Sequence, residues 1–89
     1  MVAKVFHAKG PHARWPEDFV LVAEVERCDD PDLAFRVVQH FGASHWARQP
    51  GVHCLVPEDS ARSTRAGDVV VLNGQPLLCL PFTGWQPLE

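Results

Sequence analysis

Long apolar runs are missing from this sequence. None approaches the roughly 18 consecutive apolar residues that a transmembrane helix needs. Residues 1–7 also lack the apolar segment of a secretory signal peptide. We therefore expect a cytoplasmic protein with no membrane partner.

The chain has three cysteines, an odd number. The three cysteines, Cys28, Cys54 and Cys79, cannot all pair with one another. Two of them stand among aliphatic residues, where a free thiol behaves as a small apolar side chain. This usage favours a reducing compartment, in agreement with a cytoplasmic location.

The motifs of common enzyme classes are absent. The chain has no nucleophile elbow, phosphate-binding loop or dinucleotide fingerprint. A catalytic set can be assembled from Cys54, His45 and Asp68, but almost any chain permits such a list, because catalysis depends on geometry. The five histidines do not have the spacing of structural zinc ligands. We therefore expect no enzymatic activity, no cofactor and no bound metal.

Positive charge is also limited, and the acidic residues are concentrated. The net charge is −3, and seven of the eleven acids lie between residues 17 and 32, including Glu24, Glu26 and Asp29. The N-terminal cations Lys4, Lys9 and Arg14 are few for the phosphate contacts that drive nucleic-acid affinity. An acidic face is therefore expected, and this charge distribution disfavours nucleic acid as a partner.

Five segments have the pattern of β-strands, and one has the pattern of a helix. The strands are expected at residues 2–7, 18–27, 52–56, 69–72 and 77–80, with Asn73-Gly74 as a hairpin turn between the last two. The helix is expected from the capping sequence Asp29-Asp30-Pro31-Asp32 to about Phe41, with Gly42 as its C-cap. Its apolar stripe is Leu33, Ala34, Val37, Val38 and Phe41.

The order β-β-α-β-β-β predicts an α+β fold in one domain over residues 1–89. We expect a small, mostly antiparallel sheet with one helix packed on a face; a partly closed small barrel is the alternative. In the strand at 18–27, alternation places Phe19, Leu21, Ala23 and Val25 on the core side.

The segment Arg62-Ser63-Thr64-Arg65-Ala66-Gly67-Asp68-Val69, followed by a short hairpin and Gly84-Trp85, resembles the YodL-like small proteins. That group carries an Arg-Ser-Xaa-Ser-Xaa-Gly-Asp-Val signature and is encoded on bacterial plasmids and phages. Here Arg65 replaces the second serine. The resemblance implies an accessory or counter-defence protein and identifies no catalytic residue.

Arginine and tryptophan recur together in the predicted loops, as Arg14-Trp15, Trp46 with Arg48, and the pair Arg62 and Arg65. Both residue types are enriched at binding hot spots. Arg62 and Arg65 could converge on an anion, or they could pair with Glu58, Asp59 or Asp68 in an ordinary loop. The tryptophans could equally cover the ends of a thin core.

These patterns predict a non-enzymatic protein that acts by binding another protein, either as a monomer or as a homo-oligomer. The partner-binding residues are expected to be Arg14, Trp15, Glu24, Glu26, Asp29, Trp46, Arg48, Arg62 and Arg65. The specific hypothesis is an inhibitor of a nucleic-acid-handling defence system, such as CRISPR or restriction, because an acidic surface can compete for a basic groove. The alternative is a nucleic-acid-binding module using Arg14, Trp15, Trp46 and Arg62.

Overall fold

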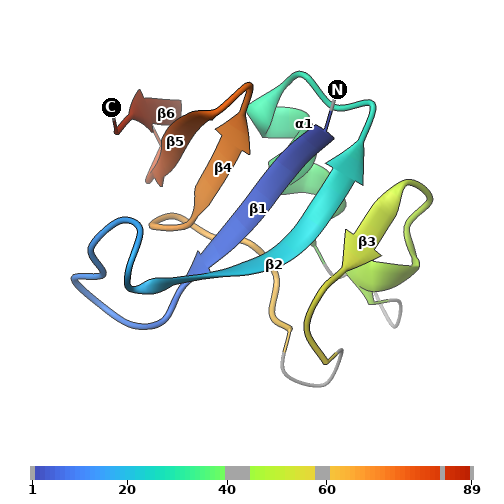
Figure 1. Cartoon of the computed structure of the whole chain (residues 1–89), viewed down its shortest axis with the longest axis horizontal. Coiled ribbons are helices and arrows are strands. Elements are labelled where there is room, and N and C mark those ends of the chain that lie inside the picture. Colours follow the sequence, from blue (N-terminus) through green and yellow to red (C-terminus); the bar gives the residue numbers. More distant parts are fainter. Residues whose placement is uncertain (1, 40–44, 58–60, 83, 89) are drawn as a thin grey trace.

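The computed structural model describes residues 2–39, 45–57, 61–82 and 84–88. In chain order the elements are β1 (Val2–Ala8), β2 (Phe19–Glu26), α1 (Pro31–Val37), the 3-10 helix η1 (Trp46–Arg48), β3 (Val52–Cys54), β4 (Val69–Leu72), β5 (Gln75–Leu80) and β6 (Gly84–Pro87). The strands form one antiparallel sheet in the order β3-β2-β1-β4-β5-β6 (Figure 1). The expected α+β class is confirmed.

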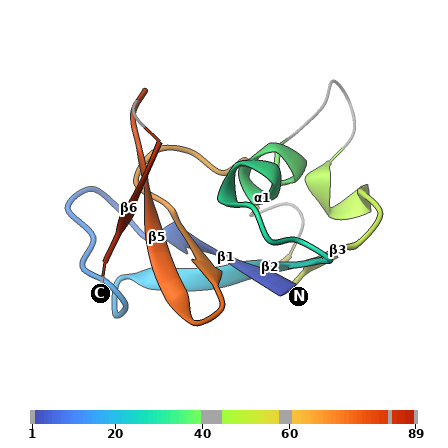
Figure 2. The same cartoon turned by 90° about the horizontal axis from the view of Figure 1, so that it is seen from above.

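The helices lie on one face of the sheet. Figure 2 shows α1 and η1 on the same side, with β5 and β6 turned up beside α1. The sheet is not closed into a barrel, so β3 and β6 are its two edges. No helix in the described part of the chain has the length and hydropathy needed to cross a lipid bilayer.

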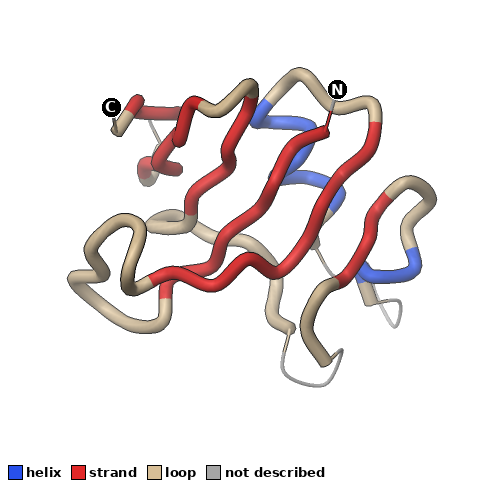
Figure 3. The backbone as a smooth tube through the Cα atoms, viewed as in Figure 1, coloured by secondary structure: helices blue, strands red, loops and turns tan. Residues whose placement is uncertain are grey.

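The main core fills the space between the sheet and the two helices. Ala3 and Val5 of β1, Ala34 of α1 and Trp46 of η1 are all fully buried in it. Figure 3 shows η1 beside β3. Because α1 and η1 lie on the same side of the sheet, one face of the sheet packs on helices and the other does not.

A β-bulge in β2 overturns the predicted alternation of that strand. Val5 pairs with Ala23, but the next residue, Phe6, pairs with Leu21, so β2 contains one extra residue. Ala23 and Val25 face the core as expected, whereas Leu21 and Phe19 share the side of Phe6. The prediction that all four face the core was wrong, because the bulge reverses the direction of every side chain before it.

We call the opposite side of the sheet the helix-free face. Directly paired residues of antiparallel strands point to the same side, so the pairing fixes its members. From β1, β2 and β3 they are Val2, Lys4, Phe6, Ala8, Phe19, Leu21, Glu24, Glu26 and His53.

The helix begins where the sequence predicts and ends earlier. The Asp30 side chain accepts a hydrogen bond from the Asp32 N–H at 2.9 Å, and Pro31 occupies the first turn. At Val38 the backbone leaves the helical conformation, with φ −97° and ψ 53°. The helix therefore ends at Val37 and not near Phe41, which lies with Gly42 outside the described residues.

Tertiary contacts explain this early end. The Thr64 N–H donates to the Val38 carbonyl at 2.9 Å. The Gln39 side chain donates to the carbonyls of Phe35 and Thr64. The loop before β4 therefore supplies the hydrogen-bond partners that another helical turn would have supplied. Leu33, expected in the buried stripe, is exposed.

The C-terminal half follows the predicted hairpin and adds a strand. Asn73 and Gly74 have φ of 51° and 76°, as a two-residue hairpin turn of this type requires. Beyond β5 the chain turns back and pairs as β6, which was not predicted. The Trp85 indole of β6 packs on Phe35 and donates to Asp32 at 2.7 Å, so this strand holds α1 from the side.

Candidate functional site

A salt bridge between a buried carboxylate and a partly exposed arginine joins the two ends of the loop that precedes β4. The carboxylate belongs to Asp68, which is only 1% exposed and lies directly before β4. Arg62 donates to both of its carboxylate oxygens, from Nη1 to Oδ2 at 2.7 Å and from Nη2 to Oδ1 at 2.7 Å. This bidentate geometry is the strongest form of an arginine–carboxylate contact.

Backbone groups complete the contacts of Asp68. The Ala8 N–H at the end of β1 donates to Oδ1 at 2.9 Å, and the Arg65 N–H donates to Oδ2 at 2.8 Å. Arg62 also donates to the carbonyls of Ser63 and Ala8. One carboxylate thus connects β1, the loop and β4, which indicates a structural role for the Arg62–Asp68 pair.

His7 and Thr64 extend this arrangement toward α1. His7 Nε2 shares a hydrogen bond of 2.9 Å with the Thr64 hydroxyl and lies 3.9 Å from Asp68 Oδ2. Burial lowers the pKa of His7 from 6.5 to about 4; Asp68 opposes this shift, while Arg62 and Arg65 add to it. The imidazole is therefore neutral at pH 7. We call His7, Arg62, Thr64 and Asp68 the polar cluster.

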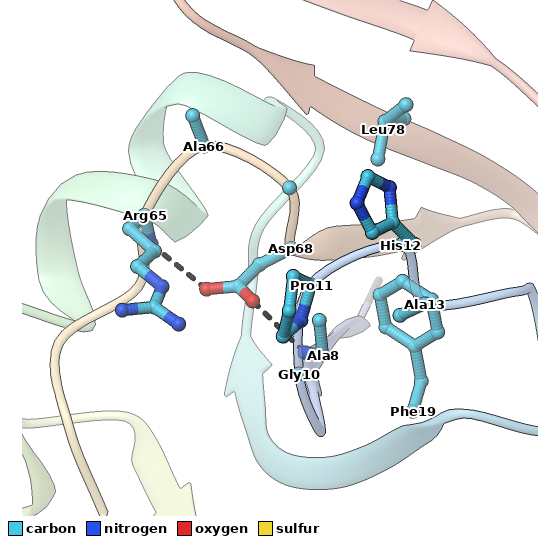
Figure 4. A pocket seen from close by; sticks show the side chains of 11 residues that line it. Ala8, Gly10, Pro11, His12, Ala13, Phe19, Arg65, Ala66, Asp68 and Leu78 are labelled. Atoms are coloured by element: carbon cyan, nitrogen blue, oxygen red, sulfur yellow. Dashed lines mark hydrogen bonds between the residues drawn. The ribbon is translucent and has the colours of Figure 1, made fainter.

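The structure separates the two arginines that were expected to act together. The alternative in which Arg62 pairs with Asp68 is confirmed; Glu58 and Asp59, the other proposed partners, lie outside the described residues. Arg65 is exposed and lines a cavity of about 340 Å³ between the turn before β4 and the loop after β1 (Figure 4). Arg62 does not line this cavity.

The helix-free face carries an aromatic cluster at one end. Trp15 packs edge-on against Phe6, with ring centroids 4.9 Å apart, and against Phe19, with centroids 5.3 Å apart. Its indole is half-buried. The neighbouring Arg14 side chain is 83% exposed and lies 3.9 Å from Asp18. The expected Arg14-Trp15 pair is therefore at the surface.

Acidic residues occupy the other end of the helix-free face. Glu24 pairs across the strands with Lys4 and with His53, and Glu26 Oε1 lies 3.3 Å from His53 Nε2. Asp29 is exposed in the loop that follows β2. Three expected partner-binding residues, Trp15, Glu24 and Glu26, thus share one face.

Trp46 does not belong to any exposed surface. Its side chain is fully buried in the main core, and its indole N–H donates to the Arg62 carbonyl at 2.9 Å. The expectation that Trp46 binds a partner was wrong, because η1 points this ring under the loop and leaves Arg48 exposed at its end. The set Arg14, Trp15, Trp46 and Arg62 is therefore not assembled as a base-stacking surface.

The polar cluster was only partly visible in the sequence. Asp68 was a possible partner of Arg62, whereas His7 and Thr64 reach each other across 57 residues and have no local signal.

Cys28, Cys54 and Cys79 are free thiols, and burial raises the pKa of Cys79. Among the described residues, no group of three histidine, cysteine, aspartate or glutamate side chains is placed to hold a metal ion.

Comparisons with family models, curated proteins and solved structures find no match for this chain.

Proposed function

We propose that this chain is a non-enzymatic, cytoplasmic protein-binding factor of a bacterial mobile element, with an accessory or counter-defence role. Its partner binds the helix-free face. The observation that carries this proposal is that this face presents an aromatic cluster at one end and acidic residues at the other, with no helix packed over them.

The aromatic cluster supplies the apolar part of the contact. Trp15 is held between Phe6 and Phe19, so little side-chain freedom would be lost when a partner covers it. Arg14 extends beside it into solvent. Tryptophan and arginine at the centre of a contact carry a large share of the binding energy in many interfaces.

The acidic part of the face favours a basic partner. Glu24, Glu26 and the nearby Asp29 belong to a protein of net charge −3. A negative surface accelerates association with a positive one and disfavours binding to nucleic acid directly. We therefore propose that the partner is a nucleic-acid-handling protein of a defence system, whose basic groove this face occupies.

The polar cluster supports the non-enzymatic part of the proposal. The oxygens of Asp68 accept hydrogen bonds from Arg62, Ala8 and Arg65, and the His7 ring is held by Thr64. These are the groups that a hydrolytic mechanism would need to have available for a substrate. Their contacts are those of a structural element.

The proposal is tested by comparing two variants in capture from a host lysate. The first carries Trp15→Ala, Glu24→Gln and Glu26→Gln on the helix-free face. The matched control carries Leu33→Ala and Arg36→Gln, two exposed positions on α1. Wild type and control are expected to retain the same nucleic-acid-handling protein, and the first variant is expected to lose it by at least about tenfold in affinity.

The purified partner then provides the decisive measurement. Wild-type protein is expected to displace DNA or RNA from it, and the helix-free-face variant is not. Equal capture by all three proteins, or a captured partner with no nucleic-acid-binding activity, would contradict the proposal.

A further inference from the structure

The cavity beside Arg65 has the features of a small-molecule site. It lies between residues 10–13 of the loop after β1 and residues 65–68 of the turn before β4. In the view of Figure 4, Asp68 lies between Arg65 and His12. Its volume of about 340 Å³ is close to the lower end of the range for ligand pockets, so it suits a compact ligand.

The charge of this cavity is set by Arg65. Asp68 is one of the residues that line the cavity, but Arg62 balances its negative charge through two hydrogen bonds of 2.7 Å. The Arg65 guanidinium is exposed, and no acceptor among the described residues contacts it. His12, also exposed, is a second nitrogen donor on the wall. A single negative charge would therefore be favoured in the cavity.

The backbone holds both sides of the cavity in defined conformations. His12 has φ 58° and Gly67 has φ 95°, both in the left-handed region. A non-glycine residue in that region is uncommon and costs backbone strain, and such residues cluster at ligand-binding and active sites. On the other side, the Arg65 N–H bonded to Asp68 fixes the base of the Arg65 side chain.

The remaining wall is mostly apolar. Phe19, Leu78, Pro11 and Ala13 contribute carbon surface that a hydrocarbon group could cover. A ligand that satisfies both parts of the cavity must combine one anionic group with a small apolar body. A phosphate dianion fits less well, because Arg65 is the one permanent cation among the described residues that line the cavity and Asp68 is close by.

We propose that this cavity binds a carboxylate carried on a compact apolar body, with the Arg65 guanidinium pairing with the carboxylate. This inference goes beyond the proposed function and does not depend on it. Arg65 is therefore a ligand-binding residue, whereas Arg62, three residues earlier, holds the fold.

The probe is N-acetyl-leucine, and the matched neutral probe is N-acetyl-leucine amide. Two-dimensional amide NMR of the whole chain is expected to show saturable shifts at His12, Ala66 and Gly67 with the acid. The expected Kd is on the order of 1 mM, as is typical for a ligand of about 12 non-hydrogen atoms. The amide is expected to bind at least about tenfold more weakly, because it lacks the charged contact with Arg65.

Variants identify the residue responsible. Arg65→Gln is expected to weaken binding of the acid by at least about tenfold, and Arg65→Lys to have an intermediate effect, because lysine keeps the charge but not the two-pronged geometry. Arg36→Gln, which removes an exposed arginine on α1, is the control and leaves binding unchanged.

A second experiment distinguishes two sources of the carboxylate, the C-terminus of a partner protein and a small free acid. A peptide that ends in leucine with a free C-terminus is compared with N-acetyl-leucine. Tighter binding of the peptide identifies a partner's C-terminus as the ligand, and equal or weaker binding identifies a small free acid. Equal binding of acid and amide, no saturable shift, or full binding by Arg65→Gln would overturn the proposal, whatever the result of partner capture.

Discussion

The two faces of the sheet place the same residue types in opposite environments. On the helix-covered side, Trp46 is fully buried and its indole N–H donates to the carbonyl of Arg62, whose own guanidinium is held by Asp68. On the helix-free face, Trp15 is half-buried and Arg14 extends into solvent. The contrast shows that a loop containing tryptophan and arginine is not in itself a binding surface, because the contacts made by each side chain decide its role.

The strongest test of this contrast compares the two tryptophans. Trp46→Ala is expected to lower the free energy of unfolding by about 3–5 kcal/mol, since it empties a large volume in the core. Trp15→Ala is expected to cost about 1 kcal/mol, from the loss of its two aromatic contacts. Urea unfolding followed by circular dichroism measures both. If Trp46→Ala does not fold, Trp46→Phe replaces it and is compared with Trp15→Phe. Equal losses of unfolding free energy in these two variants would refute the contrast.

The next largest effect is expected at the two arginines of one loop. Arg62→Ala leaves the Asp68 carboxylate buried without its partner and is expected to cost about 3 kcal/mol. Arg65→Ala is expected to change stability by less than about 0.5 kcal/mol, as is usual for an exposed side chain. Thermal unfolding of the two variants gives the difference. A double-mutant cycle with Asp68→Asn is expected to show strong coupling for Arg62 and none for the Arg65 side chain.

The last prediction concerns pH and His7, whose effect reaches its full size only near pH 4. The pKa of His7 is lowered from 6.5 to about 4, so between these values the unfolded chain binds a proton that the folded chain does not. The stability therefore falls as the pH decreases from 6.5 toward 4, by at most about 3 kcal/mol, because one pKa unit corresponds to about 1.4 kcal/mol.

This dependence is measured as the urea midpoint at a series of pH values. His7→Gln removes the titrating ring and is expected to flatten the slope over this range. A slope that persists in His7→Gln would show that other groups cause it.

The fold was largely predictable because its signals are local. Alternating apolar residues located β1 and β2, a continuous apolar run located β4, and Asp30-Pro31 and Asn73-Gly74 marked the helix start and the hairpin. The bulge between Val5 and Phe6 was not predictable, because an extra residue in one strand is defined only by its partner strand. The early end of α1 was missed for a similar reason, since Thr64 lies 26 positions beyond Val38.

The candidate sites depend even more on distant contacts. The pairing of Arg62 with Asp68, six residues apart, was one of the alternatives in the sequence. The assignment of Trp15 to an aromatic cluster required Phe6 and Phe19 to share a face, which follows only from the bulge. Likewise, Arg65 and His12 line one cavity only because β1 and β4 are neighbours in the sheet.

The edges of the sheet have a consequence for how this protein behaves at high concentration. β3 has three residues, and β6 contains Pro87, which has no N–H to offer to another strand. Both margins are therefore poor templates for fibril growth or for strand exchange between molecules. The chain can leave a broad sheet surface open to solvent with little risk of polymerising, and a partner is expected to lie across the strands without lengthening the sheet.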